Sequence, residues 1–181
     1  MYRFSLLLAL AILAGCANSS TDDNAPEPLQ TMQVDLQRYQ GTWYELARLP
    51  MYFQRGCLQS QAQYELDEQG QIDVTNRCLK ADGQWKEATA KAWPQVEGRT
   101  DKLWVRFDNW FSRLAPGLTK GHYWVIYHDP DYRYALVGNP DREYLWLLSR
   151  TPEVDASTRE QLLQIARDQG FDIDKLVWRQ D

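Results

Sequence analysis

The chain has 181 residues, of which 44% are hydrophobic, 25% charged and 13% aromatic. These values are typical of a globular protein and fit one domain preceded by a leader. The formal net charge of -5 argues against a nucleic-acid-binding protein, because nucleic acid requires a concentrated basic surface. No stretch beyond residue 20 is long and apolar enough to span a bilayer.

The N-terminus predicts a secreted lipoprotein. A short basic start precedes the apolar run from Phe4 to Leu13, which is too short to span a bilayer and ends in small residues. The sequence "LAGC" that ends at Cys16 resembles the cleavage box of bacterial lipoproteins. This resemblance implies a signal peptide over residues 1–15, acylation of Cys16 and, because Ala17 follows, the outer rather than the inner membrane. The alternative is an ordinary signal peptide with an incidental cysteine.

A tether and one folded domain are expected after the signal peptide. From Asn18 to about Gln33 the sequence is polar, contains two prolines and has no apolar period. Residues 16–33 are therefore predicted to form a lipidated flexible tether, and residues 34–181 the domain.

The two remaining cysteines, Cys57 and Cys78, predict a disulfide, because an even pair in the oxidising periplasm is usually bonded. A metal pair or a reactive thiol is the weaker alternative, since the chain has only two histidines and no C-x-x-C motif. The expected strand register places Cys78 opposite Ser60, three residues from Cys57. A bulge or a loop conformation near Gly56 is needed to bring the two sulfurs within bonding distance.

From Thr42 onward, apolar residues recur mostly at every second position, and turn residues interrupt them every eight to twelve positions. This pattern is typical of an all-β barrel or sandwich. Eight strands in sequential order close most simply as an antiparallel up-and-down barrel, because closure removes exposed edges. The expected strands are Trp43–Arg48, Gln59–Leu66, Gln71–Arg77, Trp85–Trp93, Leu103–Phe107, His122–Tyr127, Tyr132–Val137 and Tyr144–Ser149.

One segment near the C-terminus departs from the period of two. Between Asp155 and Gln169 the apolar residues cluster at helical spacing, and Gly170 follows as a stop signal. An amphipathic helix is therefore expected against the outside of the barrel, followed by a short ninth strand at Leu176–Trp178.

Three short segments together resemble the signature of the lipocalin family. They are Gly41-Thr42-Trp43 at the first strand, Asp131-Tyr132 after a proline turn, and Arg150 at the end of "WLLSR". More narrowly, "WYELAR", "FQRGC" and "DPDYRYALV" resemble the bacterial outer-membrane subgroup related to apolipoprotein D. The resemblance implies an eight-stranded calyx, closed at one end, in which Arg150 lies across the Trp43 ring. A guanidinium over an indole is also a favourable cation–π contact on physical grounds.

For this subgroup the resemblance implies a binding protein that carries or stores a fatty acid or lysophospholipid at the outer membrane. The protein would face the periplasm, need no cofactor and bind no nucleic acid, and a homodimer is left open. Burial of an acyl chain yields about 0.8 kcal/mol per CH₂, so an apolar tube is enough for affinity. The alternatives are a lipid-modifying enzyme on the same barrel and a structural envelope protein with a filled barrel.

No catalytic or metal-ligating residue is predicted. The sequence lacks the G-x-S-x-G motif of hydrolases, and His122 and His128 have no companion motif. With a period of two, both histidines share one face of their strand, which is expected to be the solvent face.

The lining of the cavity is predicted from alternation, and from the family pattern where both faces of a strand are apolar. Tyr134 and Leu136 are expected to share a face with Trp146 and Leu148, and the alanines between Ala88 and Ala92 leave space opposite large rings. The predicted ligand-binding residues are Tyr64, Ile72, Val74, Ala90, Val105, Phe107, Tyr123, Val125, Tyr127, Tyr134, Leu136, Tyr144, Trp146 and Leu148.

Two features allow alternative interpretations. Glu45 shares the inward phase of Trp43, so it either pairs with a nearby arginine or meets a polar head group, because a bare buried carboxylate is costly. The segment from Asn109 to Lys120 is either a partly packed loop or a loop at the mouth that contacts lipid. Its lipid-contacting residues would be Trp110, Phe111 and Leu114.

Overall fold

The structure is a computed structural model that describes residues 27–108 and 120–180. The predicted signal peptide, the acylation site Cys16 and the apolar residues of segment 109–119 lie outside the described residues. Within the described ranges, no helix has the length and the hydropathy that a membrane span requires.

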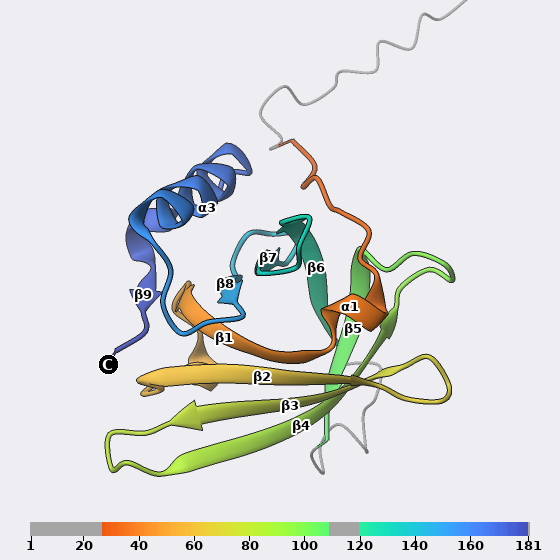
Figure 1. The fold of residues 1–181 in the computed structure, drawn as a ribbon, viewed down its shortest axis with the longest axis horizontal. Helices are drawn as coiled ribbons and strands as arrows, with labels where there is room; N and C mark the ends of the chain where they lie inside the picture. The colour runs from red at the N-terminus through yellow and green to blue at the C-terminus, as the bar shows by residue number, and fades with distance from the viewer. Residues whose placement is uncertain (1–26, 109–119, 181) are drawn as a thin grey trace, which may run out of the picture.

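Eight antiparallel strands form a closed up-and-down barrel (Figure 1), as the sequence predicted. Each strand pairs with its neighbour in sequence, and the pairing of the first strand with both the second and the eighth closes the sheet. The strands are β1 (Gly41–Arg48), β2 (Gln59–Leu66), β3 (Ile72–Leu79), β4 (Trp85–Pro94), β5 (Lys102–Phe107), β6 (Lys120–His128), β7 (Tyr134–Gly138) and β8 (Leu145–Ser149).

The up-and-down order gives the barrel two different ends. The connections after β1, β3 and β7 lie at one end, and those after β2, β4, β6 and β8 lie at the other. The short helix α1 (Leu36–Tyr39) precedes β1 and belongs to the second end. We call the second end the closed end and the first the open end. The Asp35 carboxylate caps α1 by accepting the backbone N–H groups of Gln37 and Arg38.

Helix α3 (Ala156–Asp168) packs outside the barrel, as predicted from its helical spacing (Figure 1). Asp155 caps its first turn by accepting the Thr158 N–H at 2.8 Å. The buried side chains of Leu162 and Ala166 join a cluster with the outer face of β7 and β8. The chain then passes through the 3₁₀ turn η2 (Ile173–Lys175) to the short strand β9 (Val177–Trp178), which pairs with the end of β1 outside the barrel.

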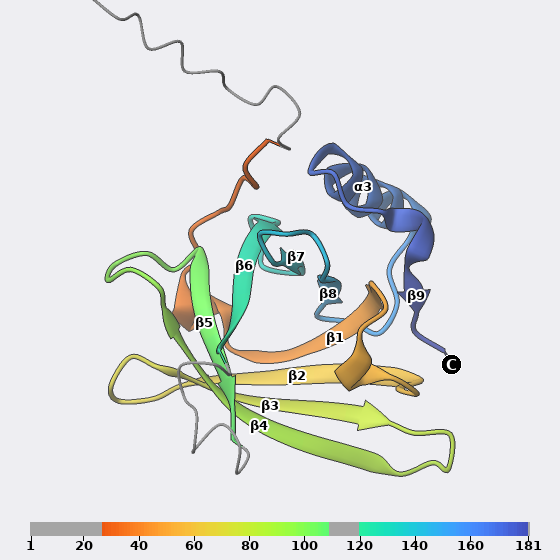
Figure 2. The same ribbon diagram turned by 180° about the vertical axis from the view of Figure 1, so that it is seen from behind.

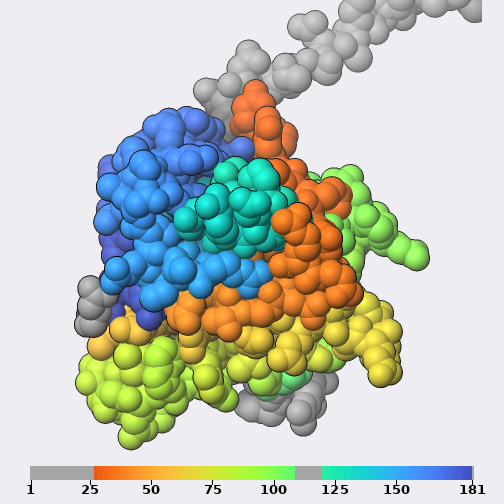
Figure 3. Space-filling model, viewed as in Figure 1, coloured from red at the N-terminus to blue at the C-terminus, as the bar shows by residue number. Residues whose placement is uncertain are grey.

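The packed body begins before the predicted boundary at residue 34. Leu29 is buried, and the Met32 N–H donates to the Val125 carbonyl at 2.9 Å. The Asp101 carboxylate accepts the Thr31 hydroxyl at 2.7 Å and the side-chain amide of Gln33 at 2.8 Å. Figure 3 shows this orange segment lying against the surface of the barrel and of α3. Residues 29–33, predicted as part of the tether, are therefore held on the domain.

Two bulges interrupt the alternation of the strands. In β1 the register against β8 shifts between Glu45 and Ala47, and in β6 the register against β7 shifts between Val125 and Tyr127. A bulge inserts one extra residue, so every later side chain on that strand changes face. Arg48 therefore points to the same side as Glu45, although strict alternation would separate them.

Candidate functional site

The closed end of the barrel is sealed by Trp43, whose side chain is fully buried. Its indole N–H donates to the Tyr39 carbonyl at 2.8 Å, and the Arg150 guanidinium carbon lies 3.9 Å from its ring centroid. The predicted cation–π contact is confirmed. Gly41 has φ +90°, a conformation that favours glycine, and a side chain there would approach Arg150 at 3.4 Å.

Arg150 holds the closed end together through backbone acceptors. Its three guanidinium nitrogens donate to the carbonyls of Arg38, Thr42 and Tyr132 at 2.9 to 3.1 Å. The hydroxyl of Tyr132 accepts the Asp35 N–H at 2.7 Å, while Asp131 beside it is exposed. The signature residues thus meet in space, and they close the barrel from segments far apart in the sequence.

Three tyrosines form a hydrogen-bonded chain above Trp43. The Tyr123 hydroxyl lies 3.0 Å from the hydroxyls of both Tyr39 and Tyr64. Burial raises the pKa of the Tyr64 hydroxyl to about 12 and raises the pKa values of Tyr39 and Tyr123 as well. All three therefore stay protonated and neutral at physiological pH, which gives the interior a polar but uncharged floor.

Above this floor the inner wall is apolar. Ten of the predicted lining residues share one cluster with Trp43. Among them, Val105, Phe107, Tyr123 and Trp146 keep accessible surface although they face the inside of a closed barrel. The inner wall is therefore not covered completely by its own side chains. The ten residues are Tyr64, Ile72, Val74, Ala90, Val105, Phe107, Tyr123, Val125, Trp146 and Leu148.

The other four predicted lining residues lie elsewhere. Tyr127, Tyr134 and Leu136 belong to the cluster between the barrel and α3. Leu136 pairs with Leu147, whereas Ala135 pairs with Leu148, so the predicted common face with Trp146 and Leu148 was wrong. Tyr144 precedes β8 at the open end, where its ring packs against Phe53 and Trp146 with centroids 5.6 and 6.1 Å away.

The histidines also occupy different faces. His122 pairs with Trp104 on the outer face, where its ring lies 4.6 Å from the indole and its Nδ1 is 3.0 Å from the Gln95 side-chain amide. His128 follows the β6 bulge and stacks on Tyr132 at the closed end. The expectation of one shared face fails because of the bulge. Among the described residues, no group of His, Cys, Asp and Glu side chains is arranged to hold a metal ion.

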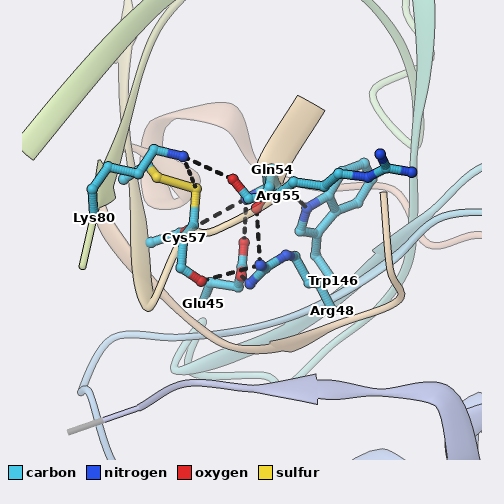
Figure 4. Close-up of a disulfide and its surroundings, with 9 residues drawn as sticks. Glu45, Arg48, Gln54, Arg55, Cys57, Lys80 and Trp146 are labelled. Atoms are coloured by element: carbon cyan, nitrogen blue, oxygen red, sulfur yellow. Dashed lines mark hydrogen bonds and ion pairs between the residues drawn. A yellow bond between two sulfur atoms is a disulfide. The ribbon is translucent and has the colours of Figure 1, made fainter. Parts of the chain in front are cut away.

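At the open end, a buried polar cluster holds the loop over residues 49–58, and we call it the mouth cluster (Figure 4). The Glu45 carboxylate accepts from Arg48 at 2.7 Å and from the Gln54 side-chain amide at 2.8 Å. The Gln54 side-chain oxygen in turn accepts the Trp146 indole N–H at 2.9 Å. Glu45 therefore pairs with an arginine, which was one of its two predicted roles.

Arg48 also fixes the backbone of this loop. Its second terminal nitrogen donates to the carbonyls of Gln54 and Cys57 at 3.1 and 3.2 Å. The side chains of both Glu45 and Arg48 are 6% exposed. Burial raises the pKa of the Glu45 carboxyl, while Arg48 and the Gln54 amide act in the opposite direction. A buried ion pair therefore holds this loop against the barrel interior.

The predicted disulfide between Cys57 and Cys78 is present, with the two sulfurs bonded at 2.06 Å. Cys78 lies opposite Ser60, as expected from the register. Gly56 has φ +70°, so the loop turns there in a conformation that favours glycine. The disulfide and the mouth cluster fix the same loop from opposite sides, as Figure 4 shows.

Comparisons with known proteins agree with this geometry. A family model described as a lipocalin-like domain matches residues 34–181. Outer membrane lipoprotein Blc of Citrobacter freundii is 41% identical over 160 residues, which cover 86% of each chain. Its counterpart in Escherichia coli strain K12 is 36% identical over 179 residues, 96% of this chain and 97% of the relative. Apolipoprotein D of Bos taurus is 32% identical over 182 residues, 95% and 91% of the two chains.

Two solved structures show the same fold. Insecticyanin from the tobacco hornworm Manduca sexta superposes with a TM-score of 0.63 at 19% identity, covering 87% of this chain and 85% of that one. The cockroach allergen Per a 4 superposes with a TM-score of 0.62 at 22% identity, covering 87% and 96%. With its closed eight-stranded barrel, its Trp43–Arg150 seal and its family match over residues 34–181, this chain belongs to the lipocalin family.

Proposed function

We propose that this lipocalin binds one small hydrophobic ligand, a fatty acid or a lysophospholipid, inside the barrel, and that it carries or stores that ligand at the bacterial outer membrane. The observation that carries the proposal is the apolar inner wall, which keeps accessible surface above a sealed floor. A fatty acyl chain buries about 0.8 kcal/mol per CH₂ in such a space. The relatives named outer membrane lipoprotein support the location.

The proposal includes an anchor at the N-terminus. Removal of residues 1–15 and acylation of Cys16 would place the barrel on the periplasmic side of the outer membrane. From Cys16 to the first described residue, Glu27, the chain takes eleven residue steps and extends at most about 40 Å, because each step adds about 3.6 Å. The barrel would therefore stay within reach of the membrane that supplies its ligand.

Copurified lipid and ligand displacement test the binding proposal. Native mass spectrometry of protein recovered from membranes should show bound lipid. A fluorescent fatty acid should bind the purified protein and be displaced by palmitate or lysophosphatidylcholine. A barrel that takes up neither probe would contradict the proposal. Turnover of the lysophospholipid during the titration would instead assign the same barrel an enzymatic role.

A filling variant locates the ligand. Val105 faces inward with small neighbours on both sides, because it pairs with Ala92 on β4 and with Gly121 on β6. Val105→Trp should fill the space beside it and weaken binding of the fluorescent fatty acid about tenfold or more. Thr89→Trp, on the exposed outer face of β4, is the matched control and should bind like the parent protein. Unchanged binding by a folded Val105→Trp variant would place the ligand outside the barrel.

A further inference from the structure

The outer face of β4, β5 and β6 carries an arrangement that ligand binding inside the barrel does not require. Helix α3 shares a cluster with side chains of β7, β8 and the later part of β6, whereas β4 and β5 lie away from it (Figure 2). Trp93 pairs with Trp104, and Trp104 pairs with His122, so the rings form one row across three strands. All three side chains are partly exposed.

A row of cations lies beside the row of rings. Lys91 pairs with Arg106, and Arg106 pairs with Lys120, which places three like charges directly opposite one another across β4, β5 and β6. Like charges in such positions destabilise a sheet. Lys91 is neutralised by Asp67 and Asp73 at 2.9 and 2.8 Å.

Arg106, Lys120 and the neighbouring Lys102 form no ion pair within the part of the chain that the structure describes. Asp108, the acidic residue two positions beyond Arg106, contacts Thr89 instead. These three cations form a local positive region on a protein whose formal net charge is -5.

The cations lie over the rings. The Lys102 ammonium is 4.2 Å from the centroid of Trp124, and the Lys120 ammonium is 5.4 Å from that of Trp104. The Arg106 guanidinium carbon is 5.5 Å from the centroid of Trp93. Partly exposed tryptophans beside lysine and arginine are typical of protein surfaces that lie at a membrane interface. Because cations already lie over these ring faces, stacking of sugar rings on them is disfavoured.

We propose that this outer face, formed by Trp93, Trp104, Lys102, Arg106 and Lys120, docks on the anionic surface of a phospholipid bilayer. Anionic head groups would complement the cations, and the indole rings would lie at the head-group level. The contact is separate from the N-terminal lipid and from the ligand inside the barrel. It would orient the barrel against the membrane rather than only tether it there.

Vesicle binding tests the docking face. The full chain carrying Cys16→Ser, which removes the proposed acylation site, is mixed with vesicles of phosphatidylcholine alone or with added phosphatidylglycerol. The protein should bind the anionic vesicles more tightly, and salt should weaken that difference. Arg106→Glu with Lys120→Glu should reduce binding to anionic vesicles about tenfold or more, since each basic residue near an anionic surface contributes to attraction.

A matched control separates the face from the net charge. Arg159→Glu with Arg167→Glu makes the same change of charge on α3, where Arg159 lies 3.5 Å over the Trp178 ring. This control should bind anionic vesicles almost as tightly as the parent protein, because it changes the net charge but leaves the docking face intact. If charge reversal prevents folding, Arg106→Gln with Lys120→Gln replaces the docking variant. Thermal unfolding checks that each variant is folded.

Three outcomes would overturn the proposal. The first is equal binding to the two kinds of vesicle, and the second is an equal loss in the docking variant and the α3 control. In the third, the parent protein is retained by oligosaccharide derived from lipopolysaccharide, the docking variant is not, and neither prefers anionic vesicles. The face would then recognise sugar rather than a bilayer. Fatty-acid displacement by a folded docking variant should stay unchanged, so failure here is distinguishable from failure of the ligand proposal.

Discussion

The closed and the open ends of the barrel are held by different chemistry. At the closed end, Trp43 and Arg150 direct their N–H groups to backbone carbonyls, which have no titration near physiological pH. At the open end, Arg48 and Gln54 converge on the carboxylate of Glu45, which titrates. The difference shows that the contacts of Trp43 and Arg150 need no titrating partner, whereas the mouth cluster depends on a buried charge that a change of pH or of one partner disturbs.

The largest effect is expected at the closed end. Trp43→Ala should lower the free energy of unfolding by about 4 kcal/mol, because it removes a fully buried ring and leaves a cavity. Denaturant unfolding measures the loss, which should be independent of pH. Trp85→Ala is the control, since that side chain is 43% exposed and should cost about 1 kcal/mol or less. A similar loss of stability in both variants would contradict the role of Trp43 as the seal of the closed end.

The next largest effect is expected in the mouth cluster. Arg48→Met should cost about 3 kcal/mol at neutral pH, because it leaves the Glu45 carboxylate buried without a cation. The cost should shrink as pH falls, since a protonated Glu45 no longer needs a partner. Adding Glu45→Gln to Arg48→Met should restore most of the lost stability. Equal losses in the single and the double variant, at every pH, would contradict the ion pair as the source of the effect.

Loss of the disulfide should affect the open end alone. Cys57→Ser with Cys78→Ser releases a loop closed over a separation of 21 residues and should lower stability by about 3 kcal/mol or somewhat less. Hydrogen exchange should rise in residues 49–58 and stay unchanged around α1 and Trp43. Faster exchange at the closed end would show that the two ends are coupled.

The smallest expected effects are on the pH dependence of the free energy of unfolding, to which the two ends contribute with opposite signs. Hydrogen bonds from Arg99 lower the pKa of Asp101, near the closed end, to about 2. Its contribution is present above its unfolded pKa of about 3.9 and is lost as pH falls towards 2. The Glu45 pKa is raised, so its contribution declines as pH rises above about 4.3.

Asp101→Asn should therefore remove part of the acid-induced loss of stability, on the order of 1 kcal/mol because solvent screens Arg99. Glu45→Gln should remove a slope of opposite sign. Stability curves measured by denaturant at several pH values test both variants. Slopes of the same sign would contradict the comparison.

The sequence predicted most of the fold because turns and alternation are local signals. The strand β2 has the predicted bounds, and the other strands differ by one or two residues at one or both ends. Capping by Asp155 and the stop at Gly170 marked α3 in the same way. The signature residues predicted the closed end, because Gly41, Trp43 and Arg150 are recognisable as a set.

Two physical features limited the prediction of the interior. Strand β7 is buried on both faces, by the barrel interior and by α3, so its two phases are equally apolar and alternation could not place Tyr134 or Leu136. Bulges gave no signal in the sequence, yet one exchanged the faces at Tyr127 and the other turned Arg48 inward beside Glu45. The mouth cluster depends on the second of these and was therefore only half predicted.

The packed N-terminal segment has a mechanical consequence. If the proposed anchor at Cys16 is pulled, the load first reaches the bonds from Arg142 to the carbonyls of Glu27 and Gln169, which join the segment to the end of α3. It next reaches the bonds of Thr31 and Gln33 to Asp101. These contacts stand in series before α1 and the tryptophan seal. A force on the anchor is therefore borne first by the contacts of this segment. The barrel can move with the membrane while no force acts on the closed end at Trp43.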